Sequence, residues 1–159
     1  MRWRLVIAAG TCIVVFGGAA RATQEAPAPP QDSPYVGAEA CQECHADNYT
    51  AWHATKHASA LNRLNAADRA GGQCIRCHAT GSPEQLAAEG ANPSLPGVQC
   101  EACHGAGRAH ADAARAGTPQ AGAIAKAPGE KNCLGCHNEQ SPHYTPFFFS
   151  AMKGLVHRR

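Results

Sequence analysis

The sequence of 159 residues has few of the side chains from which a protein builds its own core. Phe, Trp and Tyr make up 6% of it, while glycine and proline occur 16 and 11 times. No stretch alternates between apolar and polar residues as a half-buried strand would. One domain is expected at this length. We predict a mainly α-helical fold with extensive loops and little or no sheet, which needs something besides its side chains to fill its centre.

Excess positive charge is also lacking, since 14 Lys and Arg face 12 Asp and Glu. A protein that binds nucleic acid would carry a basic patch, so no nucleic-acid partner is expected. Three of the basic residues lie in residues 1–22, which resemble a secretory signal peptide with a basic start, an apolar run from Leu5 to Ala20 and small residues at Ala20 and Ala22. Its removal would also discard Cys12 and leave 11 basic against 12 acidic residues. We therefore predict a periplasmic protein, bound to a membrane only if this segment stays uncleaved.

Cysteine and histidine, with nine copies each, are the residues this chain has in abundance. The pattern C-x-x-C-H occurs four times and is typical of c-type haem attachment. Its two thiols form thioethers with one haem, and the adjacent histidine binds the iron from one face. The prediction is four covalently bound haem c groups. The predicted attachment residues are Cys41, Cys44, Cys74, Cys77, Cys100, Cys103, Cys133 and Cys136, and the predicted proximal iron ligands are His45, His78, His104 and His137.

Zinc and disulfide bonds are the alternatives for these cysteines. Four C-x-x-C pairs could form two four-cysteine zinc sites, and eight cysteines could pair as disulfides. Neither alternative requires the histidine that follows the second cysteine in all four motifs. Haem attachment explains both residue types.

Five further histidines could bind iron from the opposite face. Only two methionines occur in the chain, so bis-His coordination is the default. We predict His57, His110 and His157 as distal ligands, while His53 and His143 remain alternatives for a fourth distal position.

Spacing along the chain limits which haem each distal histidine serves. His45 and His57 would lie roughly 18 Å apart on a continuous helix, too far to bind opposite faces of one haem. The six residues from His104 to His110 would barely reach around a haem edge. We therefore expect an interlocked arrangement, in which one segment completes the haem of another.

The remaining pattern predicts three helices and a tether. A helix is expected over residues 47–64 with Asp47 as its N-cap, a second from Pro83 to about Gly90, and a last helix capped by Thr145 and Pro146. Residues 23–34 are rich in Pro, Gln and Ala and are predicted to form a flexible linker. The haem domain is expected to span residues 35–159.

Three stretches resemble the tetrahaem cytochromes of the cytochrome c554 type. The first is Tyr35-Val36-Gly37 with Ala40-Cys41, Trp52 and His57. The most specific is Gly97-Val98-Gln99-Cys100-Glu101-Ala102-Cys103-His104-Gly105-Ala106-Gly107 with His110. The third is Cys133 to His137 with Asn138, Ser141-Pro142 and His157.

The resemblance implies short helices around closely packed haem pairs and a role in periplasmic electron transfer, not catalysis. It also implies three bis-His haems, with His57, His110 and His157 as distal ligands. One haem would be five-coordinate, that attached at Cys74 and Cys77. The expected partners are redox proteins that bind through small, transient interfaces. The alternative function is a small enzyme that reduces a nitrogen oxide at the five-coordinate haem.

Overall fold

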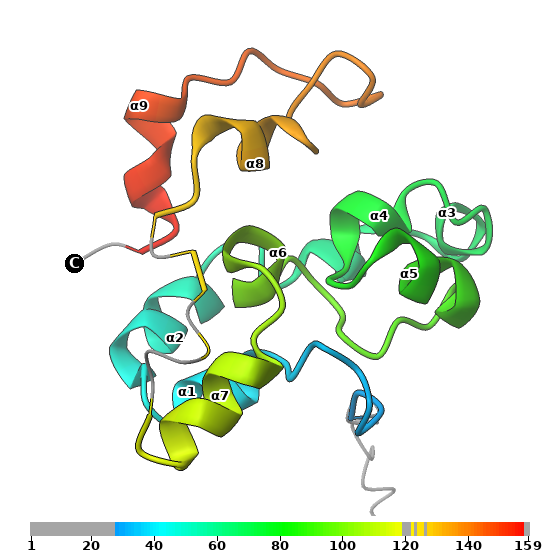
Figure 1. Ribbon diagram of the computed structural model, residues 1–159. Coiled ribbons are helices and arrows are strands. Elements are labelled where there is room, and N and C mark those ends of the chain that lie inside the picture. The colour runs from blue at the N-terminus through cyan, green and yellow to red at the C-terminus, as the bar shows by residue number, and fades with distance from the viewer. Residues whose placement is uncertain (1–27, 119–121, 123, 126, 158–159) are drawn as a thin grey trace, which may run out of the picture.

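The computed structural model describes residues 28–118, 122, 124, 125 and 127–157, so the predicted signal peptide and Cys12 lie outside the described residues. Short helices joined by loops form the fold (Figure 1). They are α1 (Ala38–Gln42), α2 (Ala46–His53), α3 (Ala66–Ala70), α4 (Ile75–His78), α5 (Pro83–Glu89), α6 (Cys100–His104), α7 (Arg108–Arg115), α8 (Glu130–Leu134) and α9 (Phe149–Met152), with 3₁₀ turns η1 (Ala60–Arg63) and η3 (Lys153–Leu155). The described part of the chain contains one isolated bridge, between Ala79 and Pro96, and no named strand. The prediction of a helical fold with little or no sheet is confirmed.

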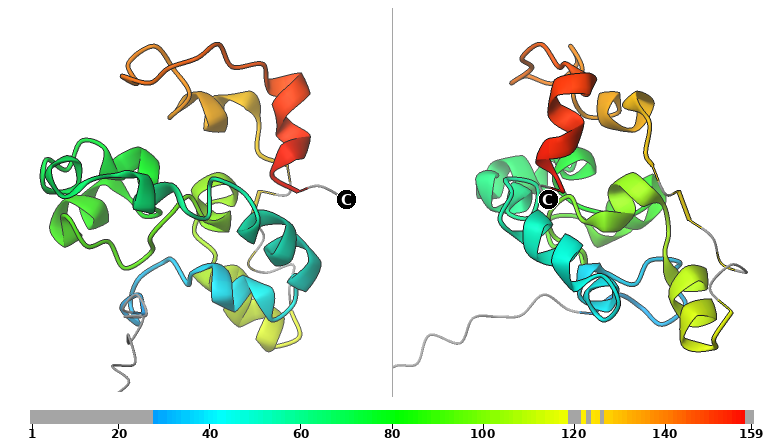
Figure 2. Two further views of the ribbon diagram at one scale, coloured as in Figure 1. Left: turned by 180° about the vertical axis from the view of Figure 1, so that it is seen from behind. Right: turned by 90° about the vertical axis from the view of Figure 1, so that its left-hand side faces the viewer.

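Helix α6 occupies the middle of the molecule. Helices α1, α2 and α7 lie on one side of it, α3, α4 and α5 on another, and α8 with α9 on a third, as the views in Figures 1 and 2 agree. None of the helices in the described ranges is long and apolar enough to span a membrane.

The predicted helix over residues 47–64 is wrong in its extent. The N-cap of α2 is His45, two residues before the predicted cap Asp47, and the helix ends at His53. Its continuation is replaced by contacts with a distant loop, because the His57 carbonyl accepts the Val98 N–H at 2.9 Å and Trp52 Nε1 donates to the Val98 carbonyl at 2.8 Å. Gly97 allows this approach, since a Cβ there would lie 2.5 Å from the Ala58 carbonyl oxygen.

The other two helix predictions differ in outcome. Helix α5 is confirmed, with Ser82 Oγ accepting the Gln85 N–H at 3.2 Å and Gly90 ending the helix at φ 61°. The last helix begins at Phe149, four residues after the predicted cap Thr145. The preceding Phe147 ring stacks on His137 at 4.8 Å between centroids, and Phe148 is extended.

The apolar core is small and lies away from most of the motifs. Its buried members are Leu61, Ile75, Ala79 and Leu86, with Leu64 packed against them. These residues come from η1, α4 and α5 and from the positions that directly follow η1 and α4. Within the described residues, this apolar cluster therefore lies at the second motif.

Buried polar side chains connect the first three motif segments. Thr80, which is fully buried, donates from Oγ1 to the Gly97 carbonyl and accepts the Gln99 N–H at 2.8 Å. Gln99 Oε1 accepts the Ala38 N–H at 2.7 Å, at the start of α1. Glu101 accepts further backbone N–H groups in the same region. Hydrogen bonds thus fix the relative positions that a larger apolar core would otherwise set.

Arg108 of α7 holds the chain just before Tyr35. The Arg108 guanidinium donates to the carbonyl groups of Pro30, Ser33 and Tyr35, and Ser33 is buried. The end of the predicted linker over residues 23–34 is therefore held against α7, because three carbonyl groups share one charged donor. Residues 23–27 lie outside the described residues.

Candidate haem sites

Each C-x-x-C-H motif begins on or beside a short helix. The third forms α6 entirely, the second overlaps α4, and the first and fourth begin at the ends of α1 and α8. A single turn of backbone therefore presents both sulfurs and the histidine of each motif. All eight motif cysteines are free thiols. In the mature protein these sulfur atoms would be thioethers.

The two alternatives for the cysteines have no support in the fold. None of the eight thiols is part of a disulfide. Within the described ranges, no three Cys, His, Asp or Glu side chains converge as a zinc site requires.

Three motif histidines each face a second imidazole from elsewhere in the chain. The ring centroids are 6.4 Å apart for His45 and His110, 6.1 Å for His57 and His137, and 6.1 Å for His104 and His157. An iron between two imidazoles needs about 2 Å to each nitrogen and roughly 1.2 Å more to each ring centre, or about 6.4 Å in all. All three pairs have the separation that one iron between them requires.

Two of the paired histidines have a buried ring nitrogen without a partner, and a third is oriented by a carbonyl group. His110 Nδ1 and His157 Nδ1 are buried without a hydrogen-bond partner among the described residues. A buried polar atom without a partner is unfavourable unless an unseen group completes it. His104 Nδ1 faces the Ala125 carbonyl, which fixes the tautomer and directs Nε2 away from that carbonyl.

Burial favours the neutral imidazole that binds metal. It lowers the pKa of His57, and the nearby His137 lowers it further. Burial and the proximity of His104 likewise lower the pKa of His157. A protonated ring could not bind iron through that nitrogen, so these surroundings suit ligands.

The second motif differs, because its histidine has no facing imidazole in the described part of the chain. His78 Nδ1 is fixed by the Ala60 carbonyl at 2.8 Å, as a proximal ligand requires. His53 stacks on Tyr49 of its own helix at 5.7 Å between centroids. His143 is exposed. Neither alternative histidine is seen facing His78.

Neighbouring thiols indicate which motifs lie close together. The nearby Cys100 thiol, together with burial, raises the pKa of Cys41. The nearby Cys136 thiol is the main cause that lowers the pKa of Cys77 to about 6. The first motif therefore adjoins the third, and the second adjoins the fourth.

A cavity of about 460 Å³ lies where the first and third motifs meet. Its walls include both histidine pairs of these motifs and three of their cysteines: Cys41, Cys44, His45, Cys100, His104, His110 and His157. The two motifs thus share one space rather than enclosing separate pockets. Apolar walls with convergent ligands suit a haem macrocycle.

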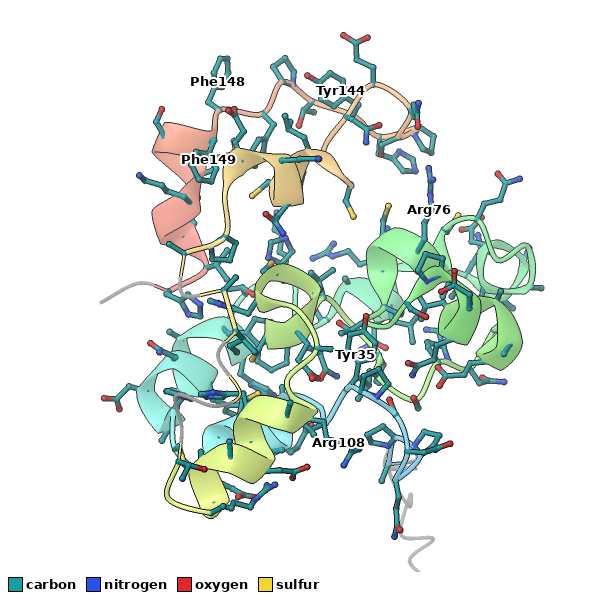
Figure 3. All side chains as sticks on the ribbon, in the orientation of Figure 1. Tyr35, Arg76, Arg108, Tyr144, Phe148 and Phe149 are labelled. Carbon is teal, nitrogen blue, oxygen red and sulfur yellow. The ribbon has the colours of Figure 1, made fainter. Side chains whose placement is uncertain are left out.

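Arg76 lies between the two cysteines of the second motif. Its side chain points from α4 toward the loop that carries Tyr144 (Figure 3). Its positive charge also lowers the pKa of Cys77. This effect is smaller than that of the neighbouring Cys136 and smaller than that of burial, which raises the pKa.

Two groups of contacts were not anticipated from the sequence. The carbonyl groups of Ala60 and Ala125 accept from proximal histidines, and no sequence signal marks a carbonyl for this role. Glu101 is almost fully buried. The sequence did offer one signal for Glu101, because a charged residue stands there between the two cysteines of a motif.

Two sequence models of known families match parts of this chain. Residues 40–105 match the sequence model of the family described as "Cytochrome c554 and c-prime", and residues 92–142 match that of the "Doubled CXXCH motif". A solved structure, the reduced state of cytochrome c554 from Nitrosomonas europaea, is similar at 25% identity over 78% of each chain with a TM-score of 0.47. Comparison with curated proteins gave no match.

Proposed function

We propose that the chain, as a multihaem c-type cytochrome of the cytochrome c554 family with covalently bound haem c, transfers electrons in the periplasm through three bis-His haems and one five-coordinate haem. Haem c supplies a one-electron couple at its iron. The eight motif cysteines would hold four haems by thioethers. The observation that carries this proposal is the 6.1–6.4 Å separation of three histidine pairs.

The histidine pairs assign each distal ligand to one haem. His110 would complete the haem of the first motif, His157 that of the third and His57 that of the fourth. Each pair joins segments far apart in the chain, so the ligands also connect the helices. The second haem would keep one axial position open, because His78 faces no imidazole in the described ranges.

The neighbouring thiols indicate which haems would lie beside one another. Cys41 beside Cys100 would place the first haem next to the third, and Cys77 beside Cys136 the second next to the fourth. Electrons would pass within each pair over a short distance. The half-buried surroundings that lower the pKa of His57 and His157 would favour the ligating form of both rings.

The proposed compartment and partners rest on the sequence. A secretory signal in residues 1–22 would deliver the chain across the inner membrane, where haem c attachment and electron exchange would take place. The partners would be redox proteins in transient contact, because electron transfer requires rapid dissociation.

Spectroscopy on the purified holoprotein tests the proposal. A pyridine haemochrome assay should give four haems per chain, and ferric electron paramagnetic resonance should show three low-spin haems and one high-spin haem. Fewer than three low-spin haems would contradict the ligand assignment.

A second candidate function is favoured by His78 alone. An iron with one open axial position could bind and reduce a nitrogen oxide. Turnover of nitrite or nitric oxide by the reduced holoprotein, lost on addition of a ligand that occupies the high-spin haem, would support this function. An unreactive high-spin haem would leave electron transfer as the only role.

A further inference from the structure

Glu101 is the one acidic side chain in the described core. It lies between Cys100 and Cys103 in α6, and 3% of its surface is exposed. A carboxylate is expensive to bury unless its oxygens are hydrogen-bonded. Because haem would only cover more of the surface, this burial does not depend on the cofactor.

The partners of Glu101 are all backbone N–H groups. Oε1 accepts from Val36 at 3.0 Å and from Gly107 at 2.7 Å, and Oε2 accepts from Val36 at 3.1 Å and from Gly37 at 2.8 Å. These donors bring no formal charge. No Lys, Arg or His in the described ranges forms an ion pair with Glu101.

Glu101 also lines the cavity shared by the first and third motifs. The same cavity is lined by His45 with His110 and by His104 with His157. The buried carboxylate thus shares one cavity with two candidate iron positions, and no cation of the described residues forms an ion pair with it.

We propose that Glu101 lowers the reduction potentials of the two haems attached at the first and third motifs. The inference rests on the proposed function, because it requires iron between these two histidine pairs. Reduction of Fe(III) to Fe(II) adds one electron at the metal, with no bond formed or broken. A nearby anion stabilises the more positive ferric state, and burial protects that interaction from screening by salt.

Glu101 also has a structural role, which the test must separate from its charge. Its four hydrogen bonds hold residues 36–37 and Gly107 against α6. Glu101→Gln removes the charge at nearly constant volume, whereas Glu101→Asp keeps the charge and shortens the side chain. Glu39→Gln is the matched control, since Glu39 is an exposed residue of α1 two positions before Cys41.

The experiment is a spectroelectrochemical titration of the three holoprotein variants and the wild type. In Glu101→Gln, the reduction equilibrium constant of at least one low-spin haem should rise on the order of tenfold, about 59 mV for one electron. Glu39→Gln and Glu101→Asp should change it less than threefold. Unchanged potentials in Glu101→Gln, or an equal rise in Glu101→Asp, would overturn the proposal.

The two proposals can fail separately. Fewer than three low-spin haems in the wild type would contradict the proposed ligands. Three low-spin haems together with unaltered potentials in Glu101→Gln would contradict only the role of Glu101.

If Glu101→Gln does not load its haems, infrared difference spectra of the wild type and Glu101→Asp decide the question. Reduction should shift a carboxylate band that moves in Glu101→Asp. Two results would refute the proposal. One is that the band whose frequency differs between the wild type and Glu101→Asp belongs to a protonated carboxyl group. The other is that no carboxylate band differs between these two proteins.

Discussion

Replacing His57 by alanine should convert one low-spin haem to high-spin and leave the other haems unchanged. His57 faces His137 with 6.1 Å between ring centroids, and neither imidazole belongs to a second histidine pair among the described residues. Three facing pairs and one lone proximal histidine give one high-spin haem in four for the wild type. The variant should therefore contain two in four, a doubling of the high-spin fraction.

Ferric electron paramagnetic resonance with quantified signals measures this fraction, and a pyridine haemochrome assay checks that all four haems are attached. The matched control is His53→Ala. His53 lies one turn earlier, stacks on Tyr49 and belongs to none of the three pairs, so its loss should leave the fraction at one in four. Added imidazole should restore the low-spin state in His57→Ala by occupying the space of the missing ring. An unchanged spectrum in His57→Ala, or a doubled fraction in His53→Ala, would refute the assignment.

Three further predictions follow from the fold. His143→Ala should leave the number of low-spin haems unchanged, because that side chain is exposed; a gain in high-spin signal would make His143 the fourth distal ligand. Gly97→Ala should destabilise the holoprotein by more than the roughly 1–2 kcal/mol of a left-handed backbone, since φ is 85° and the new Cβ would lie 2.5 Å from the Ala58 carbonyl oxygen. Gly90→Ala, at φ 61° with nothing within 4 Å, should show only the backbone cost, and equal thermal shifts for both variants would contradict the steric argument. The haem-free chain should lack a cooperative unfolding transition in circular dichroism, since its core cluster holds only four buried residues; a sharp transition would show that the haems are not needed for folding.

Local signals allowed parts of the fold to be predicted. Ser82, Pro83 and Gly90 fixed both ends of α5, because capping depends on residues within one turn. The prediction of one helix over residues 47–64 was wrong because a distant residue decided where that helix ends. Its apolar spacing continued past His53, but the distant Val98 took the His57 carbonyl as a hydrogen-bond acceptor.

The proximal half of each site is a local feature of the sequence. Two cysteines and a histidine within five residues lie on one turn of backbone, so the motif specifies attachment and one axial ligand without reference to the rest of the chain. The family resemblance named the distal candidates. It did not give their partners, since His157 could reach any haem by length alone.

The sequence by itself determined that this protein carries covalently bound haem, in a helical fold with little or no sheet, because those properties depend on residue types at short spacing. Only the tertiary structure decided that His57 faces His137, that His110 faces His45, and that the Glu101 carboxylate is buried beside two candidate haems. These relations join segments tens of residues apart. They are set by hydrogen bonds and packing between distant loops, which no local pattern encodes.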